Sequence, residues 1–163
     1  LTDTIAWHHW PREHLISPEE IVLNLVECTC KQSNFLLNVA PRFDGSIPKK
    51  QAQALRTAGQ WLEKNGEAIY GVNAQPLDDM CTSTWGRFAL KGDRIYFYAT
   101  RWPDDGEVVV GGIREKISGA RVLSSGRKLA FAQQDGRLTI GNLPAGMPDD
   151  YCSVIVLEKE NHA

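Results

Sequence analysis

Residues 34–41 read NFLLNVAP, a nearly continuous apolar run that ends in proline. A short apolar run with a break at each end is typical of a strand that is buried on both faces. Such strands belong to parallel sheets whose two faces are covered by helices. We therefore interpret residues 34–39 as one buried strand of a β/α architecture.

The sequence on both sides of this run predicts a helix. Residues 17–20 read SPEE and combine an N-cap serine, a proline at the first helical position and a capping-box glutamate. Apolar residues at helical spacing follow, so this helix should run to about Gln32. Pro48 opens a second helix with one apolar side, and Asn65-Gly66 should end it in a left-handed conformation.

A single buried parallel strand needs neighbours, and residues 1–66 offer none beyond a short candidate at 4–7. Each backbone group left unpaired in the interior would cost about 1 to 3 kcal/mol. We therefore expect the missing strands to lie in an N-terminal region and the chain to be the C-terminal part of a larger enzyme.

Beyond Tyr70 the pattern changes to short β segments separated by turn signals such as Lys91-Gly92-Asp93. Strands at a spacing of about ten residues are typical of an antiparallel sandwich. Seven segments have this character: 85–90, 94–100, 107–110, 120–123, 129–132, 138–140 and 151–157.

Composition excludes some classes of function. The chain has 163 residues, a formal net charge of −2 and a pI near 6.1, which gives no electrostatic support for nucleic-acid binding. No apolar run approaches the roughly 20 residues of a membrane span. No basic segment followed by an apolar one marks a signal peptide, which leaves localisation open.

The cysteines carry little further information. Cys28 and Cys30 fall on different sides of the first helix, so they cannot share a metal and are interpreted as small buried apolar residues. Cys81 and Cys152 flank the β region and could pair in an oxidising compartment, although nothing in their spacing demands it.

The densest group of polar side chains is in residues 7–14, WHHWPREH. A metal site would use His8, His9, Glu13 and His14, but adjacent histidines diverge and the spacing matches no common pattern. An active-site loop would use His and Glu for proton transfer and Trp as an apolar wall. A surface loop with partly buried aromatic residues is the third interpretation.

Asn38 and Pro41 follow the predicted strand at its carboxyl end, where β/α barrels place their active sites. A structural amide that bonds to loops explains Asn38 equally well. Four aromatic residues of the β region could form a sugar-stacking platform, although packing in the core is favoured: Trp85, Tyr96, Tyr98 and Trp102.

Five sequence words in this order and spacing resemble the C-terminal part of the α-L-fucosidases of glycoside hydrolase family 29. The words are SPEEI at 17–21, NFLLNVAP at 34–41, DGSIP at 44–48, GQWL at 59–62 and NGEAIYG at 65–71. WGRF at 85–88 and RWP at 101–103 are also similar to that family's C-terminal domain. WHH at 7–9 departs from the W-G-Y or W-F-Y type of the family.

The resemblance implies an α+β chain: the terminal β/α unit of a (β/α) barrel over residues 1–71, then an antiparallel β-sandwich over 72–163. It implies the C-terminal portion of a retaining exo-glycosidase that hydrolyses terminal α-L-fucose from glycans or glycoconjugates, with no metal and no organic cofactor. The alternatives are a non-catalytic module that binds carbohydrate or stabilises the barrel, and a relative acting on another deoxy-sugar.

The resemblance also implies the partners and the location. Expected partners are fucosylated glycans or glycoconjugates and the N-terminal remainder of the barrel, with no nucleic acid and no membrane. A homo-oligomer is compatible with this organisation, and a secreted, periplasmic or lysosomal location is expected.

In this family an aspartate attacks the anomeric carbon and a second carboxylic acid protonates the leaving oxygen, with carboxyl groups about 5 to 5.5 Å apart. The nucleophile lies upstream of this chain, so the chain alone should be inactive. Glu13 stands in the loop where some members carry the acid/base. By the same resemblance Trp7 and Phe35 would bind substrate, with the Phe35 ring against the fucose methyl group. His8 in the polar loop and Asn38 at the carboxyl end of the predicted strand are the other candidates for substrate binding.

Overall fold

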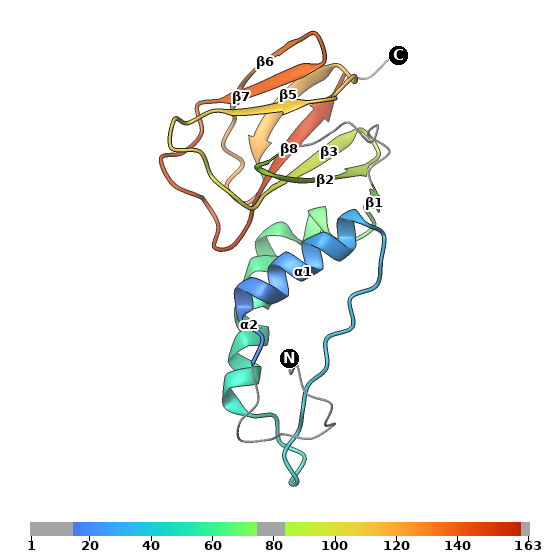
Figure 1. The fold of residues 1–163 in the computed structure, drawn as a ribbon, viewed down its shortest axis with the longest axis vertical. Helices are drawn as coiled ribbons and strands as arrows, with labels where there is room; N and C mark the ends of the chain where they lie inside the picture. The colour runs from blue at the N-terminus through green and yellow to red at the C-terminus, as the bar shows by residue number, and fades with distance from the viewer. Residues whose placement is uncertain (1–14, 75–83, 161–163) are drawn as a thin grey trace.

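The structure is a computed structural model that describes residues 15–74 and 84–160, two helices followed by a β-sandwich (Figure 1). The helices are α1 (Pro18–Cys30) and α2 (Lys49–Asn65), and a short 3₁₀ turn η1 (Gly66–Ala68) follows α2. The strands are β1 (Asn73–Ala74), β2 (Gly86–Lys91), β3 (Arg94–Ala99), β4 (Val108–Gly111), β5 (Ile117–Val122), β6 (Ala130–Gln134), β7 (Arg137–Gly141) and β8 (Ser153–Lys159).

The first helix begins where the sequence predicts. The Ser17 Oγ accepts the Glu20 amide N–H at 3.1 Å, and the Glu20 carboxylate accepts the Ser17 amide N–H at 2.7 Å. This reciprocal capping box satisfies two of the backbone donors that every helix start leaves unpaired. Gln32 follows the helix with a φ of +52°, so the chain leaves α1 at the predicted place.

The second helix ends differently from the prediction. Gly66 has a φ of −60° and continues the right-handed path into η1, so a left-handed stop at Asn65-Gly66 is wrong. Asn65 is buried and its Nδ2 donates to the Trp61 carbonyl at 3.3 Å, which keeps the chain helical. The left-handed residue comes later, at Gly71 with a φ of +70°.

The β region is an antiparallel sandwich, as predicted. One sheet has the strand order β1-β2-β3-β8-β5 and the other has the order β4-β7-β6. The seven predicted strands are present with shifted ends, and the two-residue β1 is an additional strand in the junction. An apolar core between the two sheets holds them together, and its largest side chains include Phe88, Phe97, Ile113 and Leu138.

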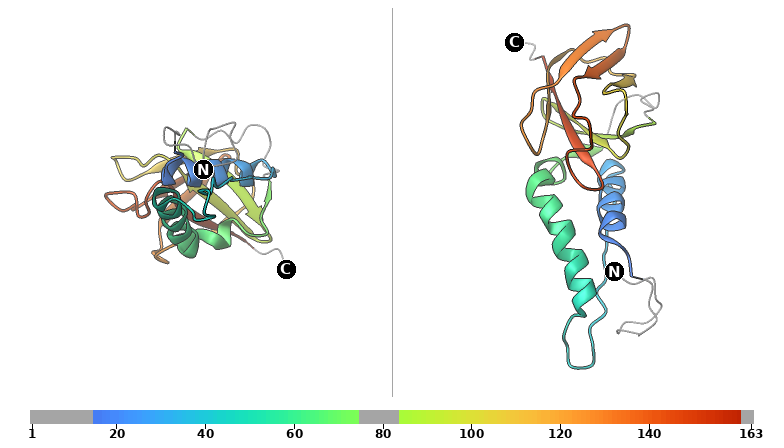
Figure 2. Two further views of the ribbon diagram at one scale, coloured as in Figure 1. Left: turned by 90° about the horizontal axis from the view of Figure 1, so that it is seen from below. Right: turned by 90° about the vertical axis from the view of Figure 1, so that its left-hand side faces the viewer.

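A second core joins the helices to the outer face of the five-stranded sheet (Figure 2). Successive residues of β3 alternate between the two cores, because side chains of a strand point to opposite faces. Ile95 and Phe97 face the other sheet, whereas Tyr96 and Tyr98 face α1 and α2. Helices and sandwich therefore share one continuous interior.

This burial decides the role of the four aromatic residues. Tyr96 and Tyr98 are fully buried, and Trp85 and Trp102 pack against the core between the sheets. The four side chains belong to two different cores, so they form no sugar-stacking platform. The packing interpretation is confirmed.

The connection between the helices differs from the prediction of a buried strand. Residues 34–39 form no strand with the described part of the chain, and Leu36 is 84% exposed. The physical reason is pairing: the described residues offer this segment no neighbouring strand. Both helices nevertheless run toward the five-stranded sheet while the connection runs the opposite way, which is the arrangement of a strand between two helices in a β/α unit (Figures 1 and 2).

Candidate functional site

The candidate site is at the end of the molecule away from the sandwich. The connection 31–48 ends there in a tight turn, and both helices begin on that side (Figures 1 and 2). In a β/α barrel the carboxyl ends of the strands and the loops that lead into the helices form the catalytic face. This end is therefore where catalytic chemistry is expected.

Residues 34–39 have two distinct faces even though they form no strand. Phe35, Leu37 and Val39 are half-buried and pack against the core that joins helices and sheet. The alternate residues Leu36 and Asn38 are exposed. This period of two is that of a β-strand. The structure thus places Phe35 and Asn38, both predicted to bind substrate, on opposite faces of the segment.

A buried hydrogen bond fixes the end of this segment to α2. The Ala40 amide N–H donates to the Gln51 Oε1 at 3.1 Å, and both residues are buried. The Gln51 Nε2 is also buried and finds no acceptor within the described part of the chain. Because a buried amide rarely stays unpaired, Gln51 has capacity for one more partner at this end.

The turn at residues 42–46 is closed by its own polar groups. The Arg42 amide donates to the Ser46 carbonyl at 2.9 Å, and the Gly45 amide donates to the Arg42 carbonyl at 2.9 Å. The Asp44 carboxylate accepts the Ser46 hydroxyl at 2.6 Å and the Ser46 amide at 2.9 Å. Gly45 has a φ of +81°, a conformation that favours glycine.

Two described carboxylates at this end, Asp44 and Glu20, do not suit the role of a general acid. Hydrogen bonds from the Ser46 side chain and backbone hold the pKa of Asp44 below its usual value, so it stays ionised. Glu20 is held in the capping box of α1. A general acid in a glycosidase needs a raised pKa instead. The predicted residues Glu13, Trp7 and His8 lie outside the described residues, and their roles stay predictions.

Metal ligation finds no support in the part of the chain that is described. Over residues 15–74 and 84–160, no group of three or more His, Cys, Asp or Glu side chains comes together in a way that could hold a metal ion. The alternative metal set of His8, His9, Glu13 and His14 lies outside the described residues. Within the same ranges, no helix is both long and apolar enough to cross a membrane.

An open groove of about 430 Å³ lies between α1 and the beginning of β2. Glu27 and Arg87 both line it, and the Glu27 Oε2 accepts the Arg87 Nε–H at 2.5 Å. Hydrogen bonds from Lys31 and from Arg87 lower the pKa of Glu27. A carboxylate held ionised between two cations cannot act as a general acid at neutral pH, so this groove is not the acid/base site.

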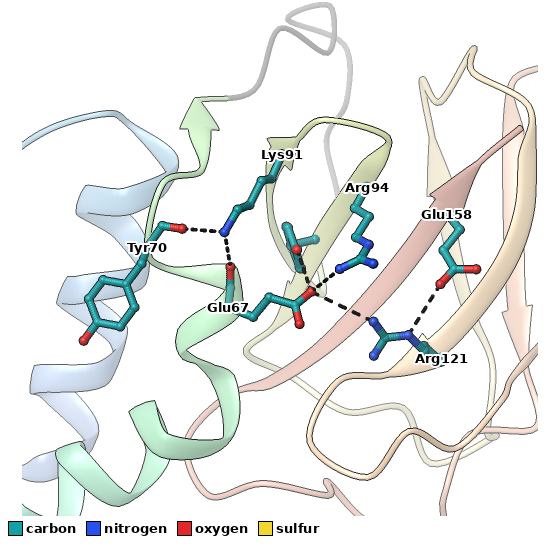
Figure 3. A network of polar contacts seen from close by, with 7 residues as sticks. Glu67, Tyr70, Lys91, Arg94, Arg121 and Glu158 are labelled. Carbon is teal, nitrogen blue, oxygen red and sulfur yellow. Dashed lines mark hydrogen bonds and ion pairs between the residues drawn. The ribbon is translucent and has the colours of Figure 1, made fainter. Parts of the chain in front are cut away.

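Residues 65–71, the NGEAIYG motif, form a polar junction between the helices and the five-stranded sheet (Figure 3). The Glu67 Oε1 accepts the Arg94 Nη1–H at 2.7 Å and the Tyr96 hydroxyl at 2.8 Å, and Arg121 Nη2 lies 4.0 Å away. Partial burial alone would raise the pKa of Glu67, but the hydrogen bonds from Tyr96 and Arg94 outweigh it and lower the pKa. The Lys91 Nζ donates to the Tyr70 carbonyl at 2.8 Å.

Two buried hydrogen bonds complete this junction. The Trp61 Nε1–H of α2 donates to the Cys152 carbonyl at 2.6 Å, and the Tyr98 hydroxyl donates to the Ala68 carbonyl. The sequence analysis gave Glu67 no role beyond its place in the NGEAIYG motif. No local signal could have found its role, because its partners Arg94 and Arg121 lie on distant strands.

The described cysteines behave as packing residues. Cys28 and Cys30 are half-buried, and Cys152 is fully buried with a free thiol. Burial, followed by the charge of Glu27, raises the pKa of Cys30 to about 12, and burial likewise raises the pKa of Cys152. Cys81, which could pair with Cys152 only in an oxidising compartment, lies outside the described residues.

Known proteins share both the sequence and the fold. A family model described as Alpha-L-fucosidase matches residues 2–67. The plasma α-L-fucosidase of Homo sapiens is 30% identical over 158 residues, which cover 87% of this chain and 34% of the relative. The α-L-fucosidase isoenzyme 1 from Paenibacillus thiaminolyticus has 30% identity and a TM-score of 0.85, covering 95% of this chain and 38% of that one.

The structure of the Thermotoga maritima α-fucosidase in complex with fucose is also similar, with 29% identity and a TM-score of 0.79 over 93% of this chain and 36% of that one. These likenesses define the class of the fold, two helices followed by two antiparallel sheets that match part of the α-L-fucosidase structures. The chain belongs to the α-L-fucosidase family, glycoside hydrolase family 29. It spans about a fifth to a third of the length of the curated relatives it matches.

Proposed function

We propose that this chain forms the last β/α unit and the C-terminal sandwich of a retaining exo-α-L-fucosidase that removes terminal α-L-fucose from glycans or glycoconjugates. The observation that carries the proposal is the segment 34–39 between two helices of the same direction, with one side packed and Leu36 exposed on the other. An apolar side chain exposed to this degree fits a strand whose neighbours belong to the remainder of a barrel. The family match over residues 2–67 supports the same assignment.

The chemistry requires groups beyond the described residues. A retaining mechanism needs a nucleophilic carboxylate and a general acid about 5 to 5.5 Å apart. The nucleophile would come from the remainder of the barrel, and Glu13 is the candidate acid/base. Of the described carboxylates at this end, Asp44 is engaged in the turn and Glu20 in the cap, whereas Glu19 is exposed in the first turn of α1. The chain alone should therefore leave fucosides uncleaved.

The two described candidates for substrate binding have different support. Asn38 lies on the exposed face of the segment, where an amide can hydrogen-bond a sugar hydroxyl inside a completed barrel. Phe35 packs toward the helices, a position that suits a wall residue as well as a contact with the fucose methyl group. Both residues are therefore candidates for contact with the sugar.

Stabilisation of the barrel is a second role of the sandwich, and the shared core favours it. Tyr96, Tyr98 and Val156 of the sheet pack directly against residues of α1 and α2. Because the sandwich contributes many of the residues in the core between the helices and the five-stranded sheet, it would support the catalytic domain even without contacting sugar. This role and the catalytic one can hold together.

The test uses the protein with its complete barrel and an aryl α-L-fucoside as substrate. Glu13→Ala should slow turnover strongly and be partly rescued by azide, because an external nucleophile can replace the missing base. Asn38→Ala should lower kcat/KM about 5- to 30-fold, which corresponds to the loss of one hydrogen bond to a sugar hydroxyl. Asn24→Ala, on the exposed side of α1, is the matched control and should leave kcat/KM unchanged. A folded complete protein that cleaves no aryl α-L-fucoside would refute the proposed activity.

A further inference from the structure

The turn at residues 42–46 presents an aromatic ring to solvent. Phe43 is 98% exposed, more than any of the other large apolar side chains that stand out on the described surface. Its neighbours in the turn are polar and also exposed: the Arg42 guanidinium and the Ser46 hydroxyl. An apolar ring beside a guanidinium and a hydroxyl is the mixture of groups that binds saccharides, whose rings have apolar faces and polar edges.

The turn holds the backbone at Phe43 in a defined place. Hydrogen bonds between Arg42 and Ser46 and between Asp44 and Ser46 close the turn on both sides of Phe43. A Cβ added at the left-handed Gly45 would meet no atom within 4 Å, so the backbone conformation of the turn and not crowding calls for glycine there. The backbone that carries the ring is therefore preorganised, which lowers the entropy lost when a ligand is bound.

The position of the turn indicates which part of a substrate Phe43 would meet. It follows directly after the segment whose carboxyl end is fixed by the Ala40 to Gln51 hydrogen bond. It lies on the same side of the molecule as the beginnings of both helices (Figures 1 and 2). An exo-acting barrel enzyme holds the terminal sugar inside its face of loops, so the remainder of the glycan leaves past the rim. An exposed residue on such a loop belongs to that rim.

We propose that Phe43, assisted by Arg42, contacts the saccharide leaving group, the sugar to which the fucose is bonded, and so determines specificity for it. The inference rests on the proposed fucosidase function and deepens it. The ring stacks on the apolar face of the leaving pyranose while the guanidinium donates to one of its hydroxyls. Neither residue takes part in bond cleavage.

The test compares two substrates of the enzyme with its complete barrel. A fucosylated oligosaccharide has a saccharide leaving group, whereas α-L-fucosyl fluoride has a single fluoride ion in its place. Phe43→Ala should lower kcat/KM for the oligosaccharide about five- to tenfold and leave the value for the fluoride unchanged. Phe43→Trp should restore the oligosaccharide rate, and Phe131→Ala, the same change at an exposed phenylalanine of β6, should alter neither rate.

Other outcomes would overturn the inference. Equal losses on both substrates together with a lower Tm would mean that the ring packs against the remainder of the barrel. Unchanged rates on both substrates would mean that the ring touches no part of the reacting glycan. If the unaltered enzyme cleaves neither substrate, the fucosidase function itself fails, and the role of Phe43 fails with it.

Discussion

The substitution Glu67→Gln removes one negative charge from the junction between helices and sheet without changing the shape of the side chain. The carboxylate accepts hydrogen bonds from Arg94 at 2.7 Å and Tyr96 at 2.8 Å, with Arg121 at 4.0 Å (Figure 3). Glutamine keeps a neutral acceptor for one of these donors. The substitution therefore isolates the contribution of the charge.

The expected loss of stability follows from these contacts. Hydrogen bonds to a charged group contribute about 1.5 to 3 kcal/mol and neutral ones about 0.5 to 1.5 kcal/mol, so two bonds in the interior would lose about 2 kcal/mol. The Glu67 side chain is 39% exposed, and solvent screening reduces this value to about 1 kcal/mol. For a chain of this size, a loss of 1 kcal/mol lowers Tm by about 2 to 4 °C.

The assay is urea-induced unfolding followed by tryptophan fluorescence at several pH values. Because the folded-state pKa of Glu67 lies below its ordinary value of 4.5, the charge stabilises the fold above pH 4.5. This contribution is lost as the pH falls through the folded-state pKa. The unfolding free energies of the original chain and the Glu67→Gln variant should therefore differ at pH 7 and converge in acid.

Glu63→Gln is the matched control, since Glu63 is exposed on α2 and should give the same unfolding midpoint as the original chain. The reasoning is refuted if Glu67→Gln unfolds at the same urea concentration as the original chain at pH 7. It is equally refuted if the difference between the two persists unchanged below the folded-state pKa of Glu67.

Four further experiments test the packing of the chain. Gly86→Ala should prevent folding or destabilise the fold severely, because a Cβ at this position would lie 1.9 Å from the Tyr98 carbonyl oxygen of β3. Gly59→Ala in α2 should raise the unfolding free energy by about 0.5 to 1 kcal/mol, because a Cβ there would have no other atom within 4 Å. Trp61→Phe should lower the unfolding free energy by about 1 to 3 kcal/mol, since it leaves the buried Cys152 carbonyl without its donor, and thermal unfolding measures this. The Cys30 thiol, with a pKa of about 12, should resist iodoacetamide at pH 8 in the folded chain and react once urea unfolds it; rapid reaction in the folded chain would contradict its burial.

Local signals explain how much of the fold could be predicted. The capping box of Ser17 and Glu20 involves residues three apart, so the sequence contains the whole interaction. The strands of the sandwich are separated by turn residues with strong conformational preferences, such as Gly92 and Gly126, which both have positive φ values. Features of this kind depend on neighbours in the sequence and were predicted correctly.

The features that escaped prediction depend on distant residues. Whether residues 34–39 form a strand depends on partner strands, and pairing cannot be read from an apolar run. Glu67 meets Arg94 and Arg121, which lie far along the chain on separate strands. The burial of Asn65 beside the right-handed Gly66 likewise depends on the whole fold and not on the local pair Asn-Gly.

The candidate site was predicted in part. Placing Asn38 at the carboxyl end of the segment agrees with its exposed position, but its role in binding sugar stays a prediction. Alternation along a strand puts residues 35 and 38 on opposite faces, and this could have been read from the sequence. The sequence analysis assigned no role to Phe43. An aromatic residue next to an Asp-Gly turn is difficult to bury, so the sequence could have indicated an exposed ring at this position.

The most direct test of the central proposal is the anomeric configuration of the first product, followed by ¹H NMR while the protein with its complete barrel hydrolyses an aryl α-L-fucoside. A retaining α-L-fucosidase releases α-L-fucopyranose first, and the β anomer then grows by mutarotation. Initial release of the β anomer would contradict the retaining mechanism. Absence of hydrolysis by the folded, complete protein would contradict the assignment of fucosidase activity itself.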